Sequence, residues 1–131
     1  MDLTEIRVEL TRLHEEAGSL FTEVLHTRPS LKLVLLRSPL EALEDRLDEH
    51  LRRFVPLDAE LIAHANAPAD INTALRNSAQ FSFYTAVRDS VRGLLTETSA
   101  SLGSTRSRLD FIGSLALSAT VLIVAVIALF V

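Results

Sequence analysis

The chain has 131 residues, a formal net charge of −4 and a hydrophobic fraction of 48%. It contains no cysteine, which excludes a disulfide framework and a thiolate metal site. Acidic and basic residues are interspersed over residues 1–110, and this balance argues against nucleic acid as the main partner. Lys32 is the single lysine among the 13 basic residues, an arginine bias that we take to indicate a prokaryotic source.

The first predicted helix covers residues 2–26. Its apolar residues recur at alternating spacings of three and four, as at the a and d positions of three heptads, and charged residues fill the positions between them. This association seam comprises Leu3, Ile6, Leu10, Leu13, Ala17, Leu20 and Val24. We favour its role as the core face of an intramolecular bundle, because three heptads are marginal for a free-standing coiled coil. An intermolecular coiled coil is the alternative, and both apply if several copies build the bundle.

The next part of the chain is also predicted to be helical. An apolar run at residues 31–36 indicates a turn or two of helix, with a lone buried strand as the alternative. A longer helix begins at Ser38-Pro39, and we expect Pro56 to end it because proline has no N–H to donate to the preceding turn. A short helix follows over residues 57–67.

Asp70 can cap a long helix that extends at least to Thr98. Its predicted apolar face comprises Ile71, Leu75, Ala79, Phe83, Val87, Val91 and Leu94. Residues 1–98 are therefore predicted to form an all-α cytoplasmic bundle of about four helices, the last of them long. Residues 99–110 form a polar, Ser/Gly-rich juxtamembrane connector, for which a flexible linker and a continuous helix are both open.

Residues 111–131 form an apolar segment without charged residues, Pro, Asn or Gln. A bilayer core about 30 Å thick is crossed by about 20 apolar residues in a helix, so we predict one transmembrane helix here. Arg106 and Arg108 precede this segment and no basic residue follows it, which by the positive-inside rule places residues 1–110 in the cytoplasm. Without an apolar leader at the N-terminus, we expect a tail-anchored, single-pass protein of a prokaryotic inner membrane.

Small side chains recur along one face of the apolar segment. With Val121 they form a predicted packing face, made of Ser114, Ser118, Val121, Ala125 and Ala128. Small residues let two membrane helices approach closely, and serine hydroxyls can bond across the contact. The alternative is that these residues are merely tolerated in a lipid-exposed anchor.

The sequence offers no complete catalytic or metal-binding pattern. Glu23-x-x-His26 matches one ligand pair of a di-iron bundle, but the second pair is missing because His14, His50 and His64 lack a glutamate three residues earlier. A Gly-x-Ser-x-Gly elbow is likewise missing. We therefore expect no enzymatic activity, cofactor or metal, and we expect His26 and His50 at helix ends, with His14 and His64 at least partly exposed.

These features favour an oligomerising scaffold, adaptor or small subunit held at the membrane. Its expected partners are membrane lipid and either further copies of itself or another protein, bound through the amphipathic helices. The alternative is a small membrane-permeabilising effector of the toxin or defence type, whose cytoplasmic domain clusters the transmembrane tails. A pore needs a polar lumen, which this segment supplies only near one end, so we favour the anchor.

Overall fold

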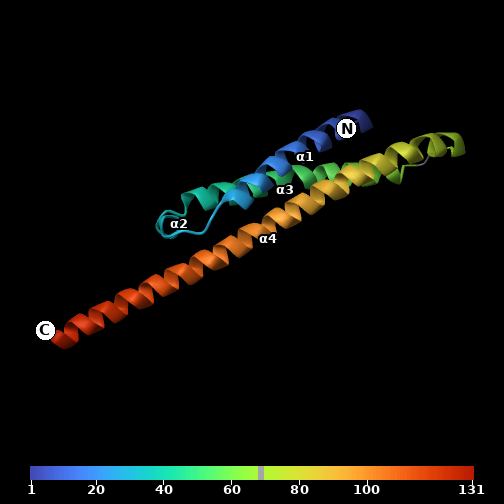
Figure 1. Ribbon diagram of the computed structural model, residues 1–131. Helices are drawn as coiled ribbons and strands as arrows, with labels where there is room; N and C mark the ends of the chain where they lie inside the picture. The colour runs from blue at the N-terminus through green and yellow to red at the C-terminus, as the bar shows by residue number, and fades with distance from the viewer. Residues whose placement is uncertain (68–69) are drawn as a thin grey trace.

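A computed structural model describes residues 1–67 and 70–131, and the side chains of these residues apart from Arg76, Asn77 and Ala79. Its elements are all helices, namely α1 (Leu3–His26), α2 (Leu31–Leu35), α3 (Ser38–Ala65) and α4 (Ile71–Phe130). α1 and α3 lie beside one half of α4, and the other half extends beyond them as a single helix (Figure 1). The predicted all-α class is confirmed, but the helices are fewer and longer than predicted.

α1 confirms the first predicted helix almost to the residue. The Glu5 carboxylate accepts a hydrogen bond from the Asp2 N–H at 3.0 Å, and this bond helps to fix the first turn. At the other end the helix stops at His26, shortly before Pro29. α1 packs against both α3 and α4, so it forms the centre of the bundle.

α3 continues through Pro56, and the prediction that this proline ends the helix is wrong. A proline inside a helix costs about 3 kcal/mol, because it removes a hydrogen bond and crowds the preceding turn. The residues beyond Pro56 still bury apolar surface, since Leu57 and Leu61 are 6% and 3% exposed. Burying two leucines contributes about 3–6 kcal/mol, which is enough to keep the helix continuous.

α4 has 60 residues and a length of about 90 Å. Asp70 caps it as predicted, because its carboxylate accepts a hydrogen bond from the Thr73 N–H at 2.8 Å. The predicted apolar face is wrong for its first turns, where Ile71 is 79%, Leu75 is 68% and Phe83 is 55% exposed. Ala79 of that face lies outside the described side chains. A constant spacing of four drifts around a helix that has 3.6 residues per turn, so these residues do not share a face with the rest.

Candidate functional site

The connector (residues 99–110) is helical throughout and forms the middle of α4, so of its two open alternatives the structure has the continuous helix. Its buried residues continue the seam of the preceding turns at spacings of three and four. The resulting α4 seam comprises Val91, Leu95, Thr98, Leu102, Thr105 and Leu109. Sequence reasoning missed the second half of this seam because its residues, Leu102, Thr105 and Leu109, are separated by polar residues in a Ser/Gly-rich stretch.

Both seam threonines satisfy their hydroxyl groups within α4. The Thr98 hydroxyl donates to the Leu94 carbonyl oxygen at 2.6 Å, and the Thr105 hydroxyl donates to the Ser101 carbonyl oxygen at 3.0 Å. A buried polar group with a hydrogen-bond partner avoids the cost of desolvation. The connector can therefore pack against the bundle although its composition is polar.

Ion pairs hold the beginning of α3 beside the last turns of the connector. Arg37 donates to the Asp110 carboxylate at 2.7 Å, and Arg106 donates to the Glu44 carboxylate at 3.3 Å. All four side chains are at least partly exposed, so each pair contributes at most about 1 kcal/mol. Their structural effect is to fix which turn of α4 lies at the end of the bundle.

Beyond these pairs, α4 enters the apolar segment (residues 111–131). This helix is long and apolar enough to cross a membrane, because an 18-residue window has a mean hydropathy of 2.5 and none of that window is buried. A soluble protein normally covers such a surface with its own core. The apolar segment thus meets the length and composition criteria for a transmembrane helix.

The predicted packing face lies on this uncovered part of α4. All five of its residues are exposed, so the fold of one chain brings nothing against Ser114, Ser118, Val121, Ala125 or Ala128. Arg106 and Arg108 are also exposed, just before the apolar segment. The role of the two arginines in membrane orientation stays a prediction, and so does the association of the packing face with another helix.

The association seam of α1 lies inside the bundle. Ile6, Leu10, Leu13, Ala17, Leu20 and Val24 are buried, and Leu3 packs against them from the edge. Their partners come from α3 and α4 of the same chain. In this arrangement the seam has no exposed face left for a second copy.

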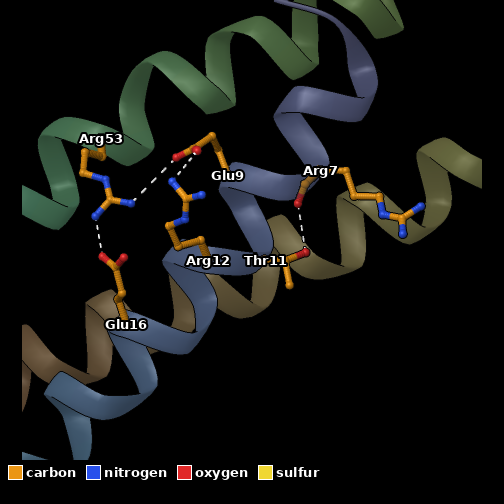
Figure 2. Close-up of polar contacts among 6 residues, drawn as sticks. All are labelled: Arg7, Glu9, Thr11, Arg12, Glu16 and Arg53. Carbon is orange, nitrogen blue, oxygen red and sulfur yellow. Dashed lines mark hydrogen bonds and ion pairs between the residues drawn. The ribbon is translucent and has the colours of Figure 1, made fainter.

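Charged side chains connect α1 and α3 and form a charged layer beside this core (Figure 2). Arg53 on α3 pairs with Glu16 on α1, and it lies 3.8 Å from the Glu9 carboxylate. Glu9 also accepts a hydrogen bond from Arg12 at 2.8 Å. The hydrogen bond from Arg53 lowers the pKa of Glu16, and the same bond raises the pKa of Arg53. Both groups thus stay charged over the physiological pH range.

His50 is a buried neighbour of Glu16, and the prediction that it lies at the end of a helix is wrong. Because α3 continues past Pro56, His50 is an internal residue that is 7% exposed. Its Nε2 atom lies 3.4 Å from the Glu16 carboxylate, and its buried Nδ1 atom has no hydrogen-bond partner among the residues that the structure describes. Burial lowers the pKa of His50, although the negative charge of Glu16 opposes this shift.

The remaining histidines make local contacts. His14 Nε2 lies 2.9 Å from the Ser90 hydroxyl, and the His64 ring bonds to the Met1 carbonyl oxygen at 2.7 Å. In the Glu23-x-x-His26 pair, Glu23 pairs with Arg46 and the His26 ring bonds to the Thr22 carbonyl oxygen. Within the described residues, no three His, Asp or Glu side chains gather in a metal-binding geometry.

Comparison with protein-family models, with characterised proteins and with solved structures yields no match to this chain.

Proposed function

We propose that this protein is a membrane-anchored scaffold or adaptor, in which α4 crosses the bilayer and the bundle lies in the cytoplasm. The observation that carries the proposal is the continuity of α4. One helix runs from the bundle core into an apolar segment that the bundle leaves uncovered. A continuous helix holds the bundle at a fixed height above the membrane and in a fixed rotation about the helix axis. A flexible linker would fix neither.

The uncovered packing face supports assembly within the membrane. Because the α1 seam is occupied inside the bundle, copies or partners would meet through other surfaces. The packing face is one such surface, since close approach of two helices needs small residues. Exposed apolar side chains on the bundle, among them Phe83 at 55% exposure, offer a second surface for a protein partner.

Assembly is tested by purifying the full chain in mild detergent and measuring the mass of the protein together with whatever co-purifies. We expect a homo-oligomer or a defined complex. Ser118→Leu should reduce the mass, because a larger side chain separates the helices. Ala119→Leu, which adds bulk on the far side of the helix, should leave the mass unchanged. A monomer without a partner would refute the scaffold.

Orientation needs a separate experiment. Protease added outside sealed spheroplasts should leave residues 1–110 intact if the arginines before the apolar segment set the orientation. Digestion of the bundle from outside would show the opposite topology. Recovery of the full chain in the soluble fraction would instead rule out the membrane anchor itself.

The same uncovered face supports a second candidate, the membrane-permeabilising effector. If α4 helices gather through their small residues, the hydroxyls of Ser114, Ser118 and Thr120 would line one end of an assembly. The Thr120 hydroxyl already donates to the Ala116 carbonyl oxygen, which leaves only its acceptor capacity for water. Collapse of the membrane potential on induced expression, abolished by Ser118→Leu, would favour the effector over the scaffold.

A further inference from the structure

The segment that joins α1 to α3 packs against the beginning of the apolar segment. Within this connection α2 lies against α4, and Leu33 faces the core with 9% exposure. Val34 approaches so closely that a Cβ atom added to Gly113 would lie 3.3 Å from its Cγ1 atom. Ile112, Gly113 and Ala116 are partly covered, whereas the other residues of the apolar segment are exposed. The bundle therefore reaches into the first two turns of the predicted span.

The outer side of this connection is apolar and uncovered. Leu31 is 60%, Leu35 is 83% and Leu36 is 57% exposed. Three neighbouring leucines that face water are unfavourable, because each fully buried leucine contributes about 1.5–3 kcal/mol relative to exposure. In Figure 1, α2 lies at the end of the bundle from which the free half of α4 extends. These leucines are thus at the level where a bilayer would begin.

Charge distinguishes the same connection from the rest of the chain. Residues 24–40 contain no acidic residue but include Arg28, Lys32 and Arg37, in a protein whose net charge is −4. Arg37 pairs with Asp110, the last charged residue before the apolar segment, and this pair sets the connection at the boundary of the span. Arg28 and Lys32 are exposed, and among the described residues neither forms an ion pair.

The basic and apolar side chains meet in a shallow hollow of about 210 Å³. The residues that line it include Arg28, Ser30, Lys32 and Ser38 together with Leu33 and Leu36. A phospholipid has the same two parts, an anionic phosphate and an acyl chain. Basic residues near an anionic membrane surface contribute about 1 kcal/mol each.

We propose that residues 28–37 form an interfacial segment that lies in the membrane surface beside α4. Leu31, Leu35 and Leu36 enter the outer acyl region, and Arg28 and Lys32 bind anionic phospholipid headgroups. The segment adds a second contact with the bilayer and, with α4, fixes the tilt of the bundle. This proposal rests on the proposed membrane span of α4. A single amphipathic contact of this kind enters the interface to a depth of about 5–10 Å.

Tryptophan fluorescence in vesicles tests the depth of the segment, because the chain has no tryptophan of its own. Leu35→Trp places one fluorophore on an exposed position of the segment, so the core is undisturbed. In the full chain reconstituted in vesicles containing phosphatidylglycerol, we expect blue-shifted emission. Lipids brominated near the headgroup end of the acyl chain should quench that emission by about half or more, and deeper bromines should quench it less.

Two further tryptophan variants distinguish a failure of the interfacial segment from a failure of the proposed membrane span. Leu122→Trp, within the apolar segment, should be quenched most by deep bromines, and Val55→Trp, exposed on α3, should not be quenched. If Leu122→Trp is quenched but Leu35→Trp is not, the interfacial segment is refuted and the span stands. If neither is quenched, the span is refuted as well. Blue-shifted but unquenched Leu35→Trp emission would mean that protein covers the segment, which also refutes the proposal.

The headgroup contact has its own readout. In the Leu35→Trp background, Arg28→Gln combined with Lys32→Gln should lower quenching in vesicles that contain phosphatidylglycerol. The same pair of substitutions should change little in vesicles of phosphatidylcholine alone, where the anionic charge is missing. Equal quenching with and without both substitutions in the anionic vesicles would contradict the assigned role of Arg28 and Lys32.

Discussion

At the scale of single residues, His50 is a titratable ring in a position where its neighbours along the α3 face, Leu47 and Phe54, are apolar. All three are buried to a similar degree. The Nε2 atom of the ring faces Glu16, but its Nδ1 atom is buried and has no hydrogen-bond partner in the described part of the chain. A buried, unpartnered polar atom typically costs about 1–3 kcal/mol. His50 therefore makes the stability of the bundle sensitive to protonation.

The direction of the pKa shift gives the sign of this pH dependence. Burial holds the pKa of His50 below its ordinary value of 6.5 in the folded protein, so the unfolded chain binds a proton at higher pH than the folded one. Neutral His50 therefore contributes fully to stability when the pH is above the ordinary pKa of histidine. This contribution is lost as the pH falls from that value toward the lowered pKa of His50 in the folded protein. We expect the free energy of unfolding of the full chain in detergent to decrease from about pH 7 to about pH 5. A pH series of thermal or chemical unfolding followed by circular dichroism measures this.

His50→Leu should remove most of that decrease, because leucine fits the apolar face and does not titrate. His26→Leu is the matched control, since His26 is exposed and its ring bonds to the Thr22 carbonyl oxygen of its own helix. A pH dependence that survives His50→Leu unchanged would show that other groups cause it. Glu16 does not interfere in this range, because its pKa is held below the ordinary value of 4.5.

At the scale of helices, Pro56 interrupts the hydrogen bonding of α3, but the helix continues through it. The proline is exposed, so replacing it removes no core packing. Pro56→Ala should restore one helical hydrogen bond and raise the free energy of unfolding by up to about 3 kcal/mol. Chemical unfolding of the two proteins measures the difference. Pro39→Ala is the control and should give little gain, because Pro39 lies in the first turn of α3, where proline is well accommodated.

The connector can be tested through its glycine. A Cβ atom added to Gly103 would meet no other atom within 4 Å, so Gly103→Ala should stabilise a continuous α4 by about 1 kcal/mol. Slower amide hydrogen exchange over residues 99–110 would accompany this gain. Gly113→Ala should gain less, because the new methyl group presses against Val34. No change in exchange after Gly103→Ala would indicate that the connector is frayed in solution.

At the scale of the whole molecule, the bundle core and the predicted transmembrane helix share one element. Buried side chains occur from Ile6 to Leu109, whereas the apolar segment after them has no buried residue. The buried core of the bundle therefore ends at Leu109, just before Asp110. The composition boundary at residue 98 falls in the middle of the α4 seam.

Two truncations distinguish these boundaries. The fragment of residues 1–110 should be helical, unfold cooperatively and remain in solution. The fragment of residues 1–98 should be less stable by about 3–6 kcal/mol, because it lacks Leu102 and Leu109 of the core. Circular dichroism with thermal unfolding compares them. Equal stability of the two fragments would show that the second half of the α4 seam contributes little to the fold.

The sequence by itself determined the helical class, the extent of α1 and its buried face, and the place of the long apolar segment. These follow from local patterns: heptad spacing for α1, the run of uncharged residues for the apolar segment, and the carboxylate of Asp70 for the beginning of α4. Each pattern has a single dominant physical cause within a few turns of chain. Neighbouring elements do not change the outcome.

Only the tertiary structure decided that α3 passes through Pro56, that the connector is helical, and that His50 lies in the core. In none of these cases does local propensity decide the outcome, which follows from burial within the bundle. That burial depends on how three helices pack side by side, and a short stretch of sequence does not specify this packing. The same packing brought Val34 beside Gly113, although about 80 residues of chain separate the two.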